Sequence, residues 1–516
     1  MKIKSSKRYT LNATPPKKGL SASDLPPSLR VFWDTAPEQF RIAAILTALN
    51  CYCALGTRIR AKYVYDLEPH ALLIQLLVLG EPGSGKSFTR PIVRQLLRPL
   101  KLKDIEQKRI EQAYNDLKKT AAKNKQLPEE PITCTRNLQT ITRAKLVKRA
   151  DMFIRKYGEP LAFFFFNEEL ATMTESNKRA FADLNTMDRL AYDLGAEYGS
   201  DTLSDASYNA DVDIIYCSLF CGTDNALNEY INKRAIEGGN CTRKILTRID
   251  EDLLGEDAPV FRRQTEQERN LISKTVDRLM DETYTEDDLL QPILNIDMEW
   301  IENSVRKWCA EQRTIILKTG SRAHNCFYKR ASVSAWRLTC MCYHLWTISN
   351  AEHPCSLSEH STSHPGHPNS HPGDPTSHSE QPTSHPGHPN GHPEHLESHP
   401  ELVSESVTGS FTTSVLGLIQ TKCIKFYRFM AAYILNGLLA QWGRQYDEMH
   451  KHDDDVAKGA VTPLYDQVPQ QFTRDQLQEL CAKSGLSPAR IFLHKWKKAK
   501  LIHQKEKGIE VYVKNY

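Results

Sequence analysis

Long apolar runs, C-x-x-C cysteine pairs and a strong net charge are all missing from this chain of 516 residues. No run reaches the ~20 apolar residues that a helix needs to cross a bilayer, so we expect no membrane partner. The N-terminus is basic but lacks the apolar core of a secretory signal. The 13 cysteines form no C-x-x-C pair, which disfavours zinc ribbons and disulfide scaffolds. These absences favour a cytoplasmic protein whose cysteines are buried as small apolar side chains.

The net charge is only +4, but the charges are unevenly distributed along the chain. Residues 1–18 carry six Lys or Arg and no acid, and residues 471–516 carry ten Lys or Arg against four acids. Each end therefore has a net charge of +6, which leaves −8 for the middle. Basic ends on an acidic body favour contact with a polyanion, although basic tails are often simply solvated.

The stretch LLVLGEPGSGKSF, residues 76–88, fits the phosphate-loop pattern G-x-x-x-x-G-K-[ST] from Gly80 to Ser87. An apolar run typical of a buried parallel strand precedes it. Gly83 and Gly85 have no Cβ, so backbone N–H groups can surround phosphate oxygens. Lys86 would reach the β- and γ-phosphates of ATP, and the Ser87 hydroxyl would bind Mg²⁺. The predicted nucleotide contacts are Gly80, Glu81, Pro82, Gly83, Ser84, Gly85, Lys86, Ser87, Phe88 and Thr223.

A second apolar run, PLAFFFFNEEL at residues 160–170, predicts the strand that ends at the catalytic acid. Glu168 is either the base that activates water beside a neutral Asn167, or the metal ligand with Glu169 as the base. Both interpretations assign Glu168 to the catalytic and metal site.

A third buried-strand pattern, residues 213–225, ends in Thr223, Asp224 and Asn225. We assign γ-phosphate sensing to Thr223 or Asn225, and Asp224 is the rival to Glu168 as the metal-binding acid. Further on, Arg243 follows a glycine-rich turn. It could neutralise transition-state charge in the site of a neighbouring subunit, or form a surface salt bridge.

Strands that alternate with helices around the phosphate loop predict an α/β P-loop NTPase domain with a RecA/AAA-like parallel sheet. Thr35 is predicted to cap the helix that follows it. A segment rich in His and Pro cannot form a core, and we expect only adventitious metal binding there. In order, we predict a disordered basic tail (1–23), the P-loop NTPase domain (24–261), a helical domain (262–350), a disordered linker (351–407), the rest of the helical domain (408–450), a linker (451–470) and a winged helix-turn-helix (471–516).

The C-terminal segment shows the order helix, turn, helix and β-hairpin, which is typical of a winged helix. Thr473 and Gln476 form a capping-box pattern at the first helix. Trp496 and Phe492 are interpreted as core residues. Winged helices also dock proteins, but the basic charge favours DNA. The predicted contacts with phosphates and the major groove are Arg490, His494, Lys497, Lys498, Lys505 and Lys507.

The chain resembles a bacterial family of P-loop proteins of unknown function, found on phage, plasmids and integrative elements and described as primase-helicase-like. The resemblance covers roughly residues 24–250 and rests on DLPPSLRVFW, TAPEQFRIAAILTAL, LLVLGEPGSGKS, NEEL, LAYDLGAEYGSD and LFCGTDNAL. It implies that Glu168, Thr223 and Arg243 match the family's acidic motif, strand end and late arginine. Two positions differ: Asn167 replaces an acid, and Asp224 stands where proline is common.

Together these patterns predict an ATPase that acts on DNA as a helicase-like motor in mobile-element replication. A ring homo-oligomer follows if Arg243 acts on a neighbour, and a primase would be a separate chain because no primase motif is present. The alternative is an ATP-binding, DNA-binding regulator or initiator that does not translocate. A third hypothesis is a metal-responsive protein that works through the His-rich segment.

Overall fold

The computed structural model describes thirteen stretches of the chain. The predicted basic tail up to residue 18 and the His/Pro-rich linker from residue 352 to 407 lie outside the described residues, as does Lys507. The described residues are 19–124, 129–139, 141–172, 184–192, 197–200, 210–249, 260–351, 413–450, 465, 468–483, 489–498, 501–506 and 509–515.

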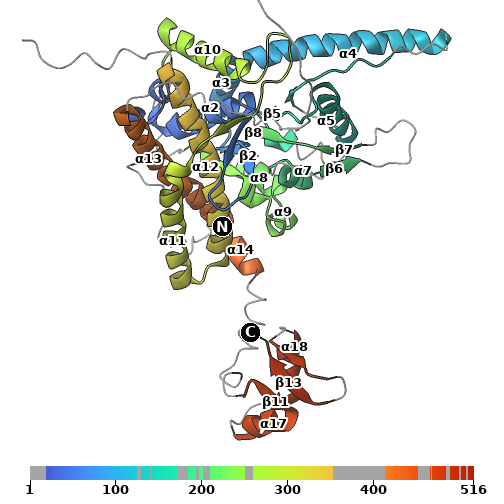
Figure 1. Ribbon diagram of the computed structural model, residues 1–516, viewed down its shortest axis with the longest axis vertical. Coiled ribbons are helices and arrows are strands. Elements are labelled where there is room, and N and C mark those ends of the chain that lie inside the picture. The colour runs from blue at the N-terminus through green and yellow to red at the C-terminus, as the bar shows by residue number, and fades with distance from the viewer. Residues whose placement is uncertain are drawn as a thin grey trace, which may run out of the picture.

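A five-stranded sheet in which every pairing is parallel lies at the centre of the molecule (Figure 1). Every residue is buried in two of its three inner strands, β8 and β3, as expected for a parallel sheet with helices on both faces. The predicted α/β class is therefore confirmed. Across the sheet the strands are β4 (Asn137–Leu138), β5 (Phe163–Asn167), β8 (Tyr216–Gly222), β3 (Gln75–Leu79) and β9 (Ile245–Arg248).

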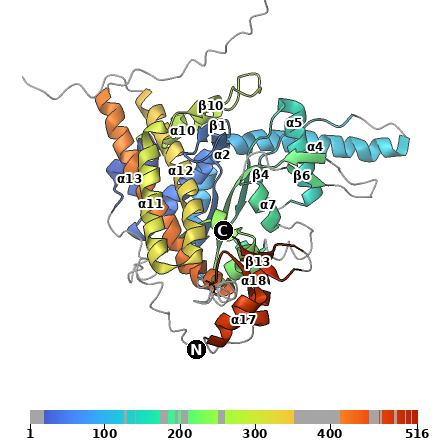
Figure 2. The same cartoon turned by 60° about the horizontal axis from the view of Figure 1, so that its bottom comes forward.

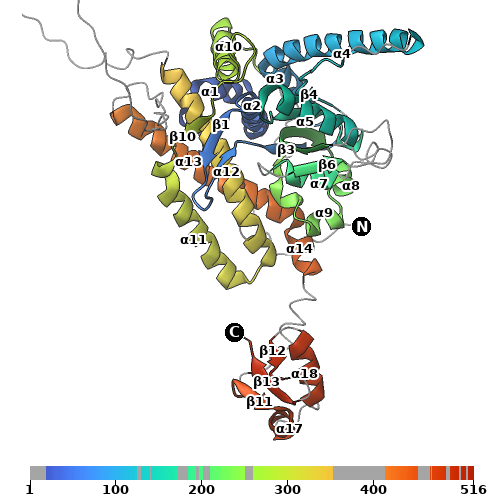
Figure 3. The same ribbon diagram turned by 45° about the vertical axis from the view of Figure 1, so that its right-hand side comes forward.

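One face of the sheet is covered by α2 (Arg41–Leu55), which contacts β3, β5, β8 and β9. Nearly every residue of α2 is buried, which fits a helix that is apolar on all sides. The opposite side carries α5 (Arg143–Tyr157), α7 (Leu184–Leu190) and α8 (Asp224–Tyr230), as Figures 1 and 3 show. After β3 come a short 3-10 turn (Lys86–Phe88), α3 (Thr89–Leu96) and the long helix α4 (Arg98–Asn124).

The helices of the second half pack beside the sheet and share its core. Buried apolar side chains from Leu25 to Trp442 form one continuous cluster, so no break in packing occurs at residues 261–262. In Figure 2 the helices α11, α12 and α13 run alongside one another, and the two that flank residues 352–412, α12 and α13, pack together extensively. The helices are α10 (Glu266–Asp281), α11 (Glu302–Thr319), α12 (Arg322–Ala351), α13 (Thr413–Leu438) and α14 (Arg444–Met449).

Two details differ from the sequence-based expectation of strands and helices. The segment after residue 262 is not wholly helical, because it contains the strand β10 (Leu294–Ile296). β10 pairs with β1 (Ile59–Lys62), which pairs on its other side with β2 (Pro69–Ala71). Residues 213–225 are not one strand either. β7 (Ala210–Asp213) first pairs with β6 (Glu197–Ser200), and β8 begins three residues later.

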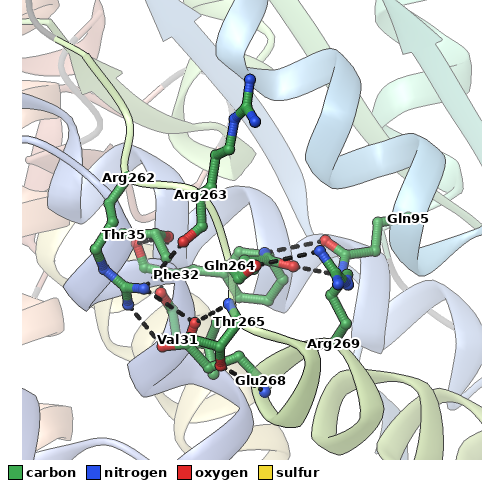
Figure 4. Close-up of polar contacts among 10 residues, drawn as sticks. All are labelled: Val31, Phe32, Thr35, Gln95, Arg262, Arg263, Gln264, Thr265, Glu268 and Arg269. Atoms are coloured by element: carbon green, nitrogen blue, oxygen red, sulfur yellow. Dashed lines mark hydrogen bonds and ion pairs between the residues drawn. The ribbon is translucent and has the colours of Figure 1, made fainter.

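Thr35 does not cap α2, so that prediction is wrong. It is the last residue of α1 (Pro27–Thr35), and its hydroxyl donates to the Val31 carbonyl at 2.7 Å, while its own carbonyl accepts the Arg262 N–H (Figure 4). Pro37 explains the difference, since a residue before proline is driven to an extended backbone, and Ala36 indeed has φ −87° and ψ 137°.

The C-terminal unit has a hydrophobic core of its own, which includes Phe472, Phe492 and Trp496. The prediction that the last two are core residues is thus confirmed. Three antiparallel strands, in the order β11-β13-β12, pack with two helices. The Thr473–Gln476 capping box is also present, with both hydrogen bonds formed. The elements are β11 (Gln471–Thr473), α17 (Arg474–Lys483), α18 (Ala489–Lys498), β12 (Ile502–Gln504) and β13 (Val511–Lys514).

Among the described helices, none combines the length and apolar character needed to span a bilayer. The twelve cysteines in the described part of the chain are all unpaired, and eleven of them are buried. They therefore pack as small apolar side chains, as the sequence predicted.

Candidate active site at the carboxyl edge of the sheet

The carboxyl ends of the parallel strands bring the predicted site residues to one edge of the sheet. β3 ends at the glycine-rich loop, β5 ends at Asn167 and β8 ends at Gly222. The first residue of the loop is tied to the neighbouring strand, because the Gly80 N–H donates to the Gly222 carbonyl at 3.1 Å. Loop, acid and strand end, which are separated by up to 140 residues in sequence, therefore belong to one surface.

The glycine-rich loop has the backbone that an anion cradle requires. Gly83 and Gly85 have φ of +87° and +83°, a region that side chains disfavour. The loop is closed internally by the Ser84 N–H, which donates to the Glu81 carbonyl at 3.1 Å. In the described part of the chain the N–H groups of Gly83, Gly85 and Ser87 meet no hydrogen-bond acceptor. Free N–H groups in a curled loop form a concave site for an anion.

The Lys86 ammonium lies inside this loop. It donates to the carbonyls of Gly80 at 2.8 Å and Glu81 at 2.6 Å, and it lies 3.4 Å from the Ser84 hydroxyl. Ser87 is exposed at the start of the following turn. The loop therefore carries the Lys86 ammonium and, next to it in sequence, the exposed Ser87 side chain.

Phe88 is a predicted nucleotide contact, but its ring packs against two other aromatic rings. It is 7% exposed, stacks on Phe261 with 5.5 Å between ring centroids, and meets Phe40 edge-on at 5.3 Å. Phe40 also lies under the loop, since a Cβ on Gly85 would come within 3.2 Å of its ring. Phe40 and Phe261 were missed from the sequence, because no local pattern connects residues so distant from the loop.

Glu168 lies just beyond β5 and is held by an arginine that sequence reasoning also missed. Arg90 Nε donates to the two carboxylate oxygens at 2.6 and 2.8 Å, and Nη2 donates to Oε2 as well. Both side chains are partly exposed, 48% for Arg90 and 27% for Glu168. Hydrogen bonds and the charge of Glu168 raise the pKa of Arg90 above its ordinary value. In the sequence, the one indication that Arg90 lies near the site is its spacing, because Arg90 comes one turn after Ser87.

The two neighbours of Glu168 have other contacts. The Asn167 carbonyl oxygen accepts the Glu169 N–H at 2.9 Å, and its amide donates to Thr172 at 2.9 Å. Asn167 therefore shapes the turn that follows β5, while Glu169 is exposed to solvent. Of the three polar residues, Glu168 alone contacts the helix that follows the glycine-rich loop.

Thr223 and Asp224 begin α8 at the end of β8. The Thr223 hydroxyl caps this helix by accepting the Ala226 N–H at 3.4 Å. The Asp224 carboxylate forms a two-pronged ion pair with Arg248, at 2.7 and 3.0 Å. Arg248 also donates to Gln441, so α8, β9 and the segment after α13 are connected here.

Arg243 lies away from the other candidates. It ends the 3-10 turn Cys241–Arg243, which directly precedes β9. In a parallel sheet that position is at the amino edge, about 13 Å along a four-residue strand from the carboxyl edge. Its guanidinium donates to the Gly239 carbonyl at 3.2 Å and lies 5.9 Å from the Tyr192 ring centre. Arg243 is therefore not placed against the glycine-rich loop of its own chain.

The amino edge beside Arg243 holds a buried polar network. Asp188 and Lys244 form an ion pair at 2.7 Å with side chains that are 2% and 1% exposed. Tyr216 and Tyr230 donate to the Asp188 carboxylate, and Gln75 accepts from Lys244 at 2.9 Å. Burial lowers the pKa of Lys244 and raises that of Tyr230. Because each charge is paired and hydrogen-bonded, this network holds together the strand starts rather than presenting reactive groups.

The predicted DNA contacts in the C-terminal unit are exposed. Arg490, His494, Lys497 and Lys498 all lie on the solvent side of α18, and Lys505 is exposed after β12. Lys497 also packs over the Tyr512 ring at 4.7 Å and donates to Gln504 at 3.2 Å. Lys495, which the sequence analysis omitted, is exposed on the same helix.

Comparison with known proteins adds no family to this description. No protein-family model matches the chain, and no curated protein matches it. The resemblance to the primase-helicase-like family thus stays a prediction.

Proposed function

We propose that this protein binds ATP at the glycine-rich loop and hydrolyses it in association with DNA, as a helicase-like motor. The observation that carries the proposal is the convergence at the carboxyl edge. Within the described residues, three N–H groups of the loop meet no acceptor, and the Lys86 ammonium lies against the same loop. Glu168 follows β5, which is separated from β3 by one strand, β8.

The residues of the loop suit a triphosphate. Its N–H groups would donate to phosphate oxygens, and the Lys86 ammonium would exchange its contacts with Gly80 and Glu81 for the β- and γ-phosphates. The exposed Ser87 hydroxyl would hold Mg²⁺. When bound, that ion would neutralise phosphate charge during the reaction.

Strand order supports Glu168 as the group that activates water. β8 lies between β3 and β5, and neighbouring strands are about 4.8 Å apart, so the loop and the acid are separated by about 10 Å. That gap accommodates a γ-phosphate and a water. The carboxylate would accept the proton of this water as its oxygen bonds to the γ-phosphorus, and the bond to the β–γ bridging oxygen would break, releasing ADP.

The C-terminal unit supports a DNA partner. Residues 490, 494, 497 and 498 recur at helical spacing, so α18 presents their side chains on one face. Helix, helix and hairpin in this order fit a winged helix whose second helix enters the major groove, with Lys505 on the wing. We expect phosphate contacts from these side chains, with binding that weakens as salt rises.

The amino-edge position of Arg243 favours action on a neighbouring subunit over action on its own site. In a ring, an arginine there would reach the nucleotide of the next copy. Mixing Lys86→Ala and Arg243→Ala subunits tests this. If each variant is inactive alone and the mixture regains ATPase activity, the result supports a ring. Mixtures that stay inactive, with Arg243→Ala also less stable, indicate a structural role.

ATPase rate with and without single-stranded DNA is the central test. We expect DNA to stimulate the wild type strongly, Lys86→Ala to abolish turnover, and Glu168→Gln to bind ATP without hydrolysing it. An ATPase rate that Lys86→Ala leaves unchanged would refute the site.

A second function, an ATP-binding DNA regulator without translocation, is favoured by one contact. Glu168 is engaged by Arg90 and its neighbour Asn167 carries no charge. Tight duplex binding without turnover would support this regulator.

A further inference from the structure

The ion pair between Arg90 and Glu168 connects the proposed catalytic acid to the helix that follows the glycine-rich loop. Its geometry is a fork, with Nε and Nη2 both directed at one carboxylate. Both oxygens of the Glu168 carboxylate accept hydrogen bonds from Arg90. Arg90 therefore competes with an attacking water for this carboxylate, and Glu168 is held away from that water as long as the ion pair persists.

Arg90 also begins a line of cations. Arg94, Arg98 and Lys101 follow at intervals of four, four and three residues, and all are exposed on α3 and α4. Such intervals place side chains on one helical face, and only Leu97 separates the two helices. Figure 1 shows α4 continuing outward from the body of the protein. We call these four residues the α3–α4 stripe.

The stripe has unneutralised charge. In the described part of the chain, no carboxylate lies within ion-pair distance of Arg94, Arg98 or Lys101, whereas Arg90 has Glu168. From Arg90 to Lys101 the helical rise is about 16 Å, which spans several phosphates of a nucleic acid strand. Charge complementarity thus favours one occupant, a phosphate backbone.

We propose that a nucleic acid strand bound along the α3–α4 stripe releases Glu168 by taking over Arg90. A phosphate offers the same pair of oxygen acceptors to a guanidinium as a carboxylate does, so the exchange needs no new kind of contact. This inference rests on the proposed function and deepens it. It makes Arg90 a positioning residue and provides a route by which DNA stimulates hydrolysis.

Arg90→Ala tests the inference in the full chain. Exposed ion pairs shift an equilibrium by only a few-fold, so we expect the ATPase rate without DNA to rise two- to fivefold and the stimulation by DNA to fall by the same factor. Arg90→Lys keeps the charge but not the planar fork and should give an intermediate rate. An unchanged or lower DNA-free rate in both variants overturns the inference.

Arg262→Ala is a matched control, because Arg262 forms a similar forked ion pair with Glu268, at 2.6 and 3.1 Å (Figure 4). Exposure is also alike, 46% and 22%. This variant should keep the wild-type ATPase rates. If it raises the DNA-free rate as Arg90→Ala does, the effect is a general response to losing an arginine, and the inference fails.

Salt dependence of DNA binding gives a second measurement that needs no ATPase activity. Replacing both Arg94 and Lys101 by Ala should reduce the slope of log affinity against log salt by about 1.8, at ~0.9 per lost phosphate contact in duplex DNA. An unchanged slope overturns binding along the stripe. Failure of the proposed function gives a different result. If ATPase activity is absent, or if Lys86→Ala leaves it unchanged, both the proposed function and this inference are refuted.

Discussion

Replacing the loop glycines by alanine separates the cost of their backbone conformation from their role in binding. Gly83 and Gly85 have φ of +87° and +83°, and Gly158, which ends α5, has +75°. An added Cβ meets nothing within 4 Å at Gly83 or at Gly158, but would lie 3.2 Å from Phe40 at Gly85. Gly83 and Gly158 are therefore a matched pair that differ only in location.

The expected magnitude follows from the left-handed backbone. An alanine there costs about 1–2 kcal/mol. In Gly158→Ala that energy should lower the free energy of unfolding. In Gly83→Ala the exposed loop can change shape instead, so the same energy appears as lost nucleotide affinity. At about 1.4 kcal/mol per tenfold, the dissociation constant for ATP should rise about 5- to 30-fold. Gly85→Ala adds the contact with Phe40 and should lose more.

Calorimetric titration with ATP, together with urea unfolding, measures both effects. Gly158→Ala should bind ATP like the wild type and unfold at lower urea, whereas Gly83→Ala should bind weakly and unfold almost like the wild type. If Gly83→Ala binds ATP with wild-type affinity, the loop does not cradle the phosphates in the conformation described, and the reasoning is refuted.

Three further predictions concern other parts of the fold. Asp188→Asn leaves the Lys244 ammonium buried without its counter-charge and should lower the free energy of unfolding by about 3–5 kcal/mol, as measured with urea. Burial lowers the pKa of His324, so the unfolded chain binds the proton more tightly and stability is lost as pH falls below about 6.5. His324→Gln should flatten that part of the melting-temperature profile. Thr473→Ala removes the α17 cap and should speed hydrogen exchange in its first turn about fivefold, which corresponds to ~1 kcal/mol.

The sequence was sufficient for features that depend on neighbouring residues. The glycine spacing predicted the loop after β3, apolar runs predicted β5 and β8, and the Thr473–Gln476 pattern predicted the α17 cap. Each signal lies within a dozen residues, where propensity and hydrophobic pattern determine the outcome.

Contacts between distant segments were not predictable in this way. β10 is a strand because β1, 235 residues earlier, offers it a partner. Phe261 belongs to the loop's surroundings because it stacks on Phe88. Arg90 looks like an ordinary charge on a helix, and only the fold shows that its partner is Glu168. A single sequence contains no periodic signal for such pairs.

Glu168 follows a firmly held strand, whereas the side chain of Arg90 is the more exposed partner of the ion pair. β5 is paired on both sides, and the turn after it is fixed by Asn167. Leu170 is packed so tightly that a Cβ on Gly222 would come within 2.8 Å of it. Arg90, in contrast, lies on the exposed side of α3, one turn after the loop that is proposed to change its contacts on binding ATP. The Arg90 side chain is the more exposed partner, at 48% against 27% for Glu168, so a change in the conformation of the arginine side chain breaks the ion pair more easily than movement of Glu168 does.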